Sequence, residues 1–288
     1  MPESADNLDS INWRGTGFAF DFPRPALVMG ILNATPDSFS DGGQFNALDN
    51  ALERVQQMIR EGADLIDIGG ESTRPNAELV SESEEISRVV PIIERISGEI
   101  SVPISIDTQK PTVAKAALQA GAKIVNDIAA NRASREMWEI VAQHGAGYVA
   151  MHMQGTPQTM QEDPHYENVA KEVADYFEDR MECFRASGVA DEQVALDVGI
   201  GFGKTLEHNL QLLGALRGYT KLRRPQLLGV SRKSLFGKLL GLEVDQRLAP
   251  SLAGAVWGAL NGVQILRVHD VAPTVHALRT IEAIRNTT

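Results

Sequence analysis

The 288-residue sequence is poor in cysteine and in basic residues, and both shortages exclude functions. Its single cysteine, Cys183, excludes an internal disulfide and fits a reducing compartment. Lys and Arg number 27 against 38 Asp and Glu, which gives a net charge of −11. Because nucleic-acid binders normally carry a clustered excess of basic residues, this balance argues against such a partner. It leaves room for an anionic small molecule bound by a few local cations.

Long apolar runs are also missing. The first 15 residues contain no apolar segment typical of a secretory signal. Residues 248–266 carry no charge, but they include Pro250, three glycines, Asn261 and Gln264, which favour a helix, a turn and a strand over a membrane span. We therefore expect a soluble, cytoplasmic protein with no membrane association.

Short apolar strands alternate with amphipathic helices along the chain. Four segments begin with a glycine after a helix, continue as an apolar strand and end in polar side chains: 61–70, 120–128, 144–152 and 261–269. Four more strands lack the leading glycine: 27–32, 103–107, 194–197 and 226–230. Helical patterns cover 48–60, 81–99, 111–119, 135–143, 169–187, 206–216, 235–240 with 252–261, and 271–284.

Eight strand-then-helix units in one undivided chain predict a (β/α)8 TIM barrel. We expect one catalytic barrel domain over residues 27–288, preceded by an N-terminal extension, residues 1–26, that forms a plug or small hairpin at the bottom of the barrel. The alternative is a doubly wound open sheet. No strand-turn-helix of the chain carries the G-x-G-x-x-G fingerprint by which such a sheet binds a dinucleotide.

Polar side chains stand at the carboxyl end of every predicted strand. In "GILNATPDSFSDGG", residues 30–43, an apolar strand runs directly into Asn, Thr, Asp and Ser. One such end is typical of a solvated turn. The full set is Asn33, Asp67 with Glu71, Asp107, Asn126 with Asp127, His152, Asp197, Ser231 to Lys233, and Arg267 with His269. All of these would converge on the face of a (β/α)8 barrel that holds the active site.

The chemistry of this set indicates the ligand. Asp107, Asn126 and Asp197 offer hydrogen-bond acceptors and one amide, which suit a neutral heterocycle with an amino-pyrimidinone edge. Three cations, Arg74, Lys233 and Arg267, suit an anionic group or a flat ring on which to stack.

Two other readings of these segments fail. "DVGIGFGKT", residues 197–205, looks like a phosphate-binding P-loop, but that motif requires glycine where this chain has Val198. His144, His152 and His269 suggest a metal-dependent hydrolase, whose site needs several His and carboxylate ligands. The first strand supplies Asn33 and no histidine, which argues against a transition-metal site held by protein side chains alone.

Several motifs together resemble the dihydropteroate synthases. They are "GILNATPDSFSDGG", "DIGGESTRP", "SIDTQKP", "NDI", "MHMQGTPQTM", "DVGIGFGK", "GVSRKS" and "RVHD", in the order found in that family. The resemblance extends from about residue 27 to 285. It implies the same barrel and a reaction that joins p-aminobenzoate to 6-hydroxymethyl-7,8-dihydropterin diphosphate, with release of diphosphate, in folate biosynthesis.

The resemblance also implies site residues, position by position. It implies a pterin on Asp107, Asn126 and Asp197, with Lys233 and Arg267 beside the ring and Met151 as an apolar wall. It implies a p-aminobenzoate side made of Phe39, Thr73, Arg74, Pro75, Phe202, Ser231 and Lys233. By the same resemblance, Asn33 would coordinate the Mg²⁺ that accompanies the diphosphate, and Arg267 and His269 would bind the diphosphate. Asp107, Lys233 and Arg267 are the expected catalytic residues.

Further expectations follow from the same resemblance. "GILNATPDSFSDGG" and "ESTRP" correspond to two mobile loops that close over the substrates; the protein would form a homodimer and bind sulfonamide inhibitors, which mimic p-aminobenzoate. The chain departs from the family pattern at Val198, where proline is common, and at Ile200, where phenylalanine is common. Because proline fixes φ, we expect the loop that holds Val198 to be less rigid.

Two other functions stay open at this point. A pterin-binding methyltransferase domain would use a similar barrel, but it has no diphosphate to bind, so "STRP" and "SRKS" would lack a purpose. A noncatalytic barrel that only binds a pterin or a partner would not need polar residues on all eight strands. Both motifs and strand ends favour the synthase.

Overall fold

The chain forms a closed barrel of parallel strands. The structure, a computed structural model, describes residues 11–34, 43–72, 79–130 and 135–287, with side chains of residues 43–47 left aside. The strands are hydrogen-bonded in the order β10-β3-β4-β5-β6-β7-β8-β9. They are β3 (Leu27–Asn33), β4 (Leu65–Gly69), β5 (Ile104–Asp107), β6 (Ile124–Asp127), β7 (Gly147–Met151), β8 (Val194–Asp197), β9 (Gln226–Leu228) and β10 (Ile265–Val268). The predicted (β/α)8 barrel is confirmed, and the open sheet is wrong.

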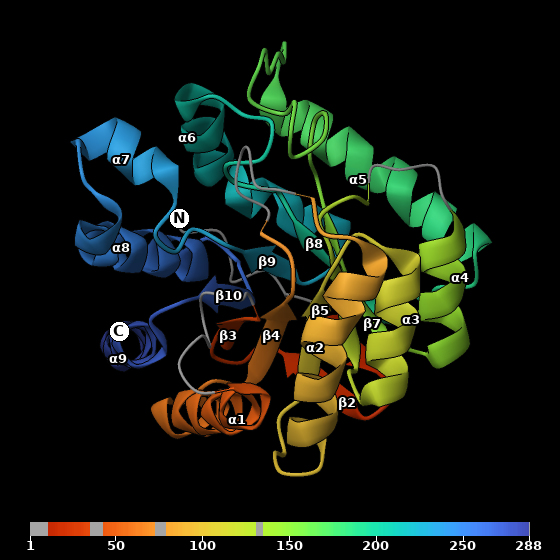
Figure 1. Ribbon diagram of the computed structural model, residues 1–288. Helices are drawn as coiled ribbons and strands as arrows, with labels where there is room; N and C mark the ends of the chain where they lie inside the picture. Colours follow the sequence, from red (N-terminus) through yellow and green to blue (C-terminus); the bar gives the residue numbers. More distant parts are fainter. Residues whose placement is uncertain (1–10, 35–42, 73–78, 131–134, 288) are drawn as a thin grey trace.

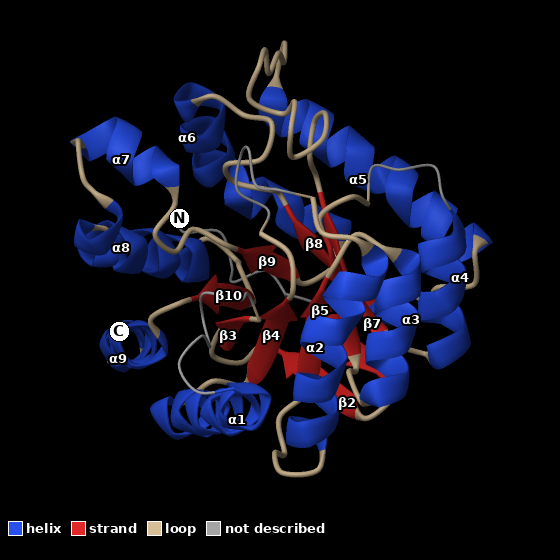
Figure 2. Ribbon diagram, in the orientation of Figure 1, coloured by secondary structure: helices blue, strands red, loops and turns tan. Residues whose placement is uncertain are grey.

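Helices surround the barrel on all sides (Figures 1 and 2). They are α1 (Gly43–Glu61), α2 (Glu82–Ser97), α3 (Pro111–Ala120), α4 (Arg135–His144), α5 (Val169–Ala186), α6 (Leu206–Ala215), α7 (Ser234–Leu240), α8 (Leu248–Leu260) and α9 (Val271–Arg285), with short 3-10 helices η2 (Asp191–Gln193), η3 (Leu216–Leu222) and η4 (Val244–Gln246). The charge-free stretch 248–266 is a helix, a turn and a strand, as expected. None of the helices in the described part of the chain is long and apolar enough to cross a membrane.

Helix ends follow local sequence signals. Ser81 caps α2, because its hydroxyl accepts a hydrogen bond from the Glu84 N–H at 3.2 Å. Pro111 is the first residue of α3, where its missing N–H costs nothing. The same helix ends at Gly121, whose φ of 125° is the kind of backbone that glycine tolerates best. These signals set where each strand begins, and hence where its carboxyl end falls.

A hairpin covers the amino-terminal end of the barrel. Strands β1 (Ile11–Gly15) and β2 (Phe18–Phe22) pair antiparallel. Trp13 is fully buried against apolar residues of the barrel interior and donates its indole N–H to the Gln193 carbonyl at 2.9 Å. This apolar cover leaves the carboxyl end of the strands as the end where polar side chains gather.

Polarity changes along the inward face of the strands. Side chains two apart on a strand share a face. Near the hairpin this face is apolar: Leu65, Ile124, Val149, Ala195, Leu227 and Ile265 pack together. Two residues farther along, the same strands present Asp67, Asn126, Met151, Asp197, Gly229 and Arg267. The intervening residues face the helices, so the polar layer lies inside the barrel at its carboxyl end.

Candidate active site

Arg267 joins the carboxylates of two other strands. Its Nε donates to Asp67 Oδ2 at 2.6 Å, and its Nη2 donates to Asp107 Oδ2 at 2.7 Å. Asn126 Nδ2 donates to the same Asp67 oxygen at 3.1 Å. The four side chains come from β10, β4, β5 and β6, so a contact network crosses the barrel mouth. Asp67 is fully buried within it.

Buried oxygens of this network have no partner among the described residues. They are Asp67 Oδ1, Asp107 Oδ1 and the Ser105 hydroxyl, all in neighbouring strands β4 and β5. A buried acceptor without a donor costs about 1–3 kcal/mol. The site therefore has acceptors available for a ligand that carries N–H donors, as an amino-pyrimidinone ring does.

Burial shifts the pKa values of the charged side chains in the site. It raises the pKa of Asp107 to about 7, although Arg267 opposes the shift, and it also raises the pKa of Asp197. Burial lowers the pKa of Lys233 to about 8 against the attraction of Asp197. For Arg267 burial alone would lower the pKa, but Asp67 and Asp107 outweigh it and raise the pKa above its ordinary value. Arg267 is thus the permanent cation of the site, while Asp107 titrates near neutral pH.

An aromatic and aliphatic wall lies beside these charges. Phe202 packs against a small buried cluster that contains Ile128, Met151, Met153 and Met160. The Lys233 ammonium lies 4.4 Å from the centre of the Phe202 ring and donates to the Ile200 carbonyl. A cation over an aromatic face is attracted by the ring quadrupole. Lys233, Phe202 and Met151 are therefore brought together on one side of the polar layer.

Ser231, His269 and Asn33 lie at the rim. The His269 ring and Ser231 Oγ are 3.0 Å apart, and the His269 N–H donates to the same hydroxyl at 3.2 Å. Asn33 is exposed at the carboxyl end of β3. Four predicted residues, Phe39, Thr73, Arg74 and Pro75, lie outside the described residues, as do most of the two loops expected to be mobile.

Three strand-end residues do not converge on the site, contrary to the prediction. Asp127 accepts from the Ala129 N–H at 2.7 Å and from the Tyr148 hydroxyl at 2.8 Å, toward α4. His152 is buried with its ring 4.8 Å from the ring of Tyr176 of α5. Arg232 forms a two-pronged ion pair with Asp270, at 2.8 and 2.5 Å. Each of these stabilises the surrounding helices and loops.

Asp67 is the residue that sequence reasoning passed over. From the sequence alone, Asp67 is only one of the polar strand ends. In the structure its carboxylate binds both Arg267 and Asn126. Its spacing carries a usable signal, because Asp67 follows the inward-facing Leu65 by two residues on β4.

The comparisons with known proteins agree with this geometry. Residues 29–269 match the family model described as pterin binding enzyme. The dihydropteroate synthase of Escherichia coli is 47% identical over 267 residues, which are 93% of this chain and 94% of that protein. The chain belongs to the dihydropteroate synthase family. It is therefore a pterin-binding enzyme.

Solved dihydropteroate synthases have the same fold. The Yersinia pestis enzyme, in a sulfonamide drug complex, superposes with a TM-score of 0.89 at 45% identity, covering 96% of this chain and all of that chain. The Burkholderia cenocepacia enzyme, complexed with 7,8-dihydropteroate, gives a TM-score of 0.86 at 43% identity, covering 96% of this chain and 97% of that one. At these identities the likeness covers both fold and family.

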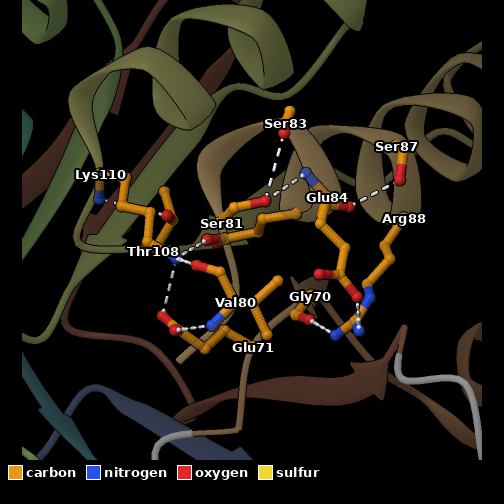
Figure 3. Close-up of polar contacts among 11 residues, drawn as sticks. Gly70, Glu71, Val80, Ser81, Ser83, Glu84, Ser87, Arg88, Thr108 and Lys110 are labelled. Atoms are coloured by element: carbon orange, nitrogen blue, oxygen red, sulfur yellow. Dashed lines mark hydrogen bonds and ion pairs between the residues drawn. The ribbon is translucent and has the colours of Figure 1, made fainter. Parts of the chain in front are cut away.

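A cluster of ion pairs borders the site on the side of α2 (Figure 3). The Lys110 ammonium donates to Glu71 at 3.1 Å, to Glu85 at 2.6 Å and to the Val80 carbonyl at 2.6 Å. Glu71 also accepts from the Val80 N–H at 2.9 Å. Glu85 is fully buried. The cluster thus ties the chain just after β4 to the chain just before α2 and to the segment that follows Asp107.

Removal of the Lys110 ammonium is expected to destabilise the fold. We expect Lys110→Met to lower the free energy of unfolding by about 2 kcal/mol, because the buried Glu85 carboxylate loses its cation. Urea unfolding followed by circular dichroism measures the loss. Lys115→Met, on the exposed face of α3, the helix that Lys110 precedes, is the control and should change the free energy of unfolding by nothing measurable. Equal stability of both variants would mean that the cluster contributes no net stability.

Proposed function

We propose that this chain joins p-aminobenzoate to 6-hydroxymethyl-7,8-dihydropterin diphosphate and holds the pterin on the polar layer inside the barrel mouth. Family membership makes the chain a transferase of folate synthesis. One observation supports the pterin site above others: the buried Asp67 and Asp107 oxygens that lack donors, held beside Arg267. Asn126 and Asp197 extend this set of acceptors around the mouth, on β6 and β8.

The reaction needs no strong nucleophile or base from the protein. The bond between the pterin methylene carbon and the diphosphate oxygen breaks, and its electron pair leaves with diphosphate. The electron-rich pterin stabilises the positive charge left on the carbon, and the buried carboxylates Asp107 and Asp197 add to this stabilisation. The aniline nitrogen then forms the new bond to carbon and loses a proton to diphosphate or water. The side chains of Lys233 and Phe202 help to exclude water, which would compete with the aniline nitrogen, from the site.

The residues at the rim fit a Mg²⁺ ion bound chiefly through the substrate. Within the described residues, no three His, Cys, Asp or Glu side chains are grouped closely enough to hold a metal ion. Mg²⁺ in diphosphate sites typically takes one or two protein oxygens and several from phosphate and water. The exposed Asn33 carboxamide, on the strand paired to β10, can supply such an oxygen. When bound, the ion would neutralise the leaving diphosphate.

Loss of the Asn33 oxygen tests this metal role. We expect Asn33→Ala to weaken Mg²⁺-dependent binding of pterin diphosphate about tenfold, the effect of one lost ligand contact, and to leave affinity for the bare pterin unchanged. Calorimetric titrations of both ligands at several Mg²⁺ concentrations make the comparison. Equal losses for the two ligands would show that Asn33 only supports the strand end.

The pKa of Asp107 gives the proposal a pH dependence. Pterin N–H donors need an ionised Asp107, so at pH 6, one unit below a pKa of about 7, we expect about tenfold weaker pterin binding than at pH 8.

Without ligand, the stability of the fold changes with pH in the opposite direction to pterin binding. The folded state binds more protons than the unfolded state, so stability falls as pH rises from about 4 to about 7. Calorimetry from pH 5.5 to 8.5 measures the pterin binding. Asp107→Asn should remove the change between pH 6 and pH 7, which lies below the pKa of about 8 of Lys233, and a flat wild-type profile would contradict the proposal.

A diphosphate-release assay separates the three candidate functions. The chain is mixed with pterin diphosphate and Mg²⁺, and free diphosphate is followed before and after addition of p-aminobenzoate. A synthase releases diphosphate in step with the second addition, whereas a pterin-binding methyltransferase or a noncatalytic binder does not. Stoichiometric formation of 7,8-dihydropteroate, followed by mass spectrometry, completes the test.

Sulfonamides are proposed as inhibitors at the p-aminobenzoate position. A structural relative from Yersinia pestis was solved with a sulfonamide drug. Phe202, Lys233 and Ser231 of this chain lie on the side where the second substrate would approach, and an aromatic ring can stack there. The inhibitors should therefore compete with p-aminobenzoate and leave the binding of the pterin unchanged.

A homodimer is proposed from exposed apolar side chains. Exposed large hydrophobic residues gather on consecutive elements of the chain: Leu239, Leu240, Val244, Leu248, Trp257 and Leu260. They come from α7, η4 and α8, which follow one another in the chain; α7 and α8 lie on the same side of the barrel in Figure 1. Covering them with a second copy would bury apolar area on both copies. Light scattering after size-exclusion chromatography measures the mass, and a monomer at micromolar concentration would contradict the proposal.

A further inference from the structure

Lys204, the lysine of the "GFGK" motif, is buried where a phosphate-binding lysine would be exposed. Its side chain is only 1% exposed. Its amino group donates to the Phe202 carbonyl at 2.8 Å and to the His152 carbonyl at 3.2 Å, and it lies 3.1 Å from His152 Nδ1. Burial lowers the pKa of His152 to about 2 and keeps its ring uncharged. Burial also lowers the pKa of Lys204 to about 7, against the attraction of Asp197. The amino group of Lys204 is therefore bonded to neutral groups inside the protein.

The two contacts with His152 connect two segments whose main chains touch, and the bond to Phe202 lies within one of them. One segment follows β7 and contains His152, and the other follows β8 and contains Gly199 to Thr205. A Cβ at Gly199 (φ 68°) would lie 2.0 Å from the His152 carbonyl oxygen, and one at Gly203 (φ 60°) would lie 2.4 Å from the Gln154 carbonyl oxygen. The backbones approach too closely for any side chain between them, and Lys204 bonds across this contact.

The segment after β8 is held at several more points. Asp197 accepts from the Gly199 N–H at 2.8 Å, Asn209 accepts from the Gly201 N–H at 2.7 Å, and the Tyr166 hydroxyl donates to the Gly203 carbonyl at 2.9 Å. Val198 and Ile200 are buried. This network holds the backbone of the segment at several points, and the looser loop expected from Val198 stays a prediction.

Residues of the two segments that Lys204 joins, Phe202 and Met151, lie together beside the polar layer of the site. The Phe202 ring contacts the cluster that contains Met151, the residue before His152. The same ring lies under the Lys233 ammonium, whose other partner is the Ile200 carbonyl of the same segment. A shift of the Phe202 backbone would therefore move the ring, and with it the support of Lys233.

We propose that Lys204 is a positioning residue of the synthase reaction, which sets the place of the Phe202 ring by binding the Phe202 carbonyl to the segment after β7. The inference rests on the proposed function, because Phe202 and Lys233 matter to the reaction only if they face its substrates. Lys204 itself does not reach the substrates, since it is only 1% exposed and its amino group is bonded to Phe202 and His152. Its effect on the reaction passes through Phe202.

The test is a double-mutant cycle. Lys204→Met keeps the length of the side chain and removes its donors, and Phe202→Ala removes the ring. We expect Lys204→Met to lower kcat/KM for p-aminobenzoate about tenfold, because the Phe202 ring is displaced. In the Phe202→Ala background, Lys204→Met should change kcat/KM less than twofold. Lys204→Gln retains an NH2 donor group on a shorter side chain, so its kcat/KM should fall between those of wild type and Lys204→Met; it serves if the methionine variant folds poorly.

A second variant distinguishes positioning from stability alone. Thr205→Ala removes the cap of α6, the hydroxyl that accepts from the His208 N–H at 3.2 Å, and leaves the Lys204 donors intact. It should lower the melting temperature while kcat/KM of the folded enzyme stays near wild type. Equal kinetic losses for Thr205→Ala and Lys204→Met, or additive losses in the cycle, would overturn the proposal. Failure of the proposed function would instead appear as no diphosphate release from the wild type.

Discussion

Arg267→Met should be the most damaging single change in the site. Arg267 is the shared cation of Asp67, which is fully buried, and Asp107, which is 11% exposed. Removing one partner of a buried ion pair costs about 3–5 kcal/mol, because the remaining charge has neither water nor a counter-ion. We expect a loss of this size in the free energy of unfolding, measured by urea denaturation, together with loss of pterin binding.

Two variants control this result. Arg14→Met breaks an ion pair of similar length, 2.6 Å to Asp21, but both side chains are more than half exposed, so stability should hardly change. Arg267→Met combined with Asp107→Asn should recover part of the lost stability, because one uncompensated carboxylate is removed. A stable Arg267→Met protein would show that the two carboxylates do not need this cation in the folded state.

Asp197→Ala should give the second largest effect, on pterin affinity. Asp197 is 7% exposed at the carboxyl end of β8, and one of its oxygens already accepts from the Gly199 N–H. A pterin N–H that loses a charged acceptor in a site closed to water costs about 2–3 kcal/mol, which is about 30- to 150-fold in Kd. Calorimetry with a pterin analogue measures the difference directly.

Asp127→Asn is the matched control for Asp197. Asp127 is also a buried aspartate at a strand end, but it binds the Tyr148 hydroxyl on the helix side of the barrel. Its substitution should lower stability and leave pterin affinity unchanged. A loss of less than about 0.5 kcal/mol for Asp197→Ala would place Asp197 outside the pterin pocket.

The sequence by itself determined the barrel and the end at which polar residues gather. Apolar runs of strand length, helical periodicity between them and a glycine at several helix ends are local signals, and eight repeats of the unit leave few topologies. The polar strand ends predicted the carboxyl face because parallel strands in a barrel all end on one side. The motifs predicted the family that the comparisons then showed.

Only the tertiary structure decided which polar residue of a neighbouring pair points inward. Asn126 faces Asp67 inside the barrel, while Asp127 faces Tyr148 outside, and Lys233 contacts Phe202 while Arg232 contacts Asp270. Strand register and barrel closure set the directions of Asn126 and Asp127, and a shift of one residue would reverse them. The turn before α7 sets those of Arg232 and Lys233. The same holds for Lys204, whose burial depends on its contact with His152, 52 residues earlier in the chain, where the two backbones touch. Such contacts leave no periodic trace in the sequence, because each partner is chosen by its position in space.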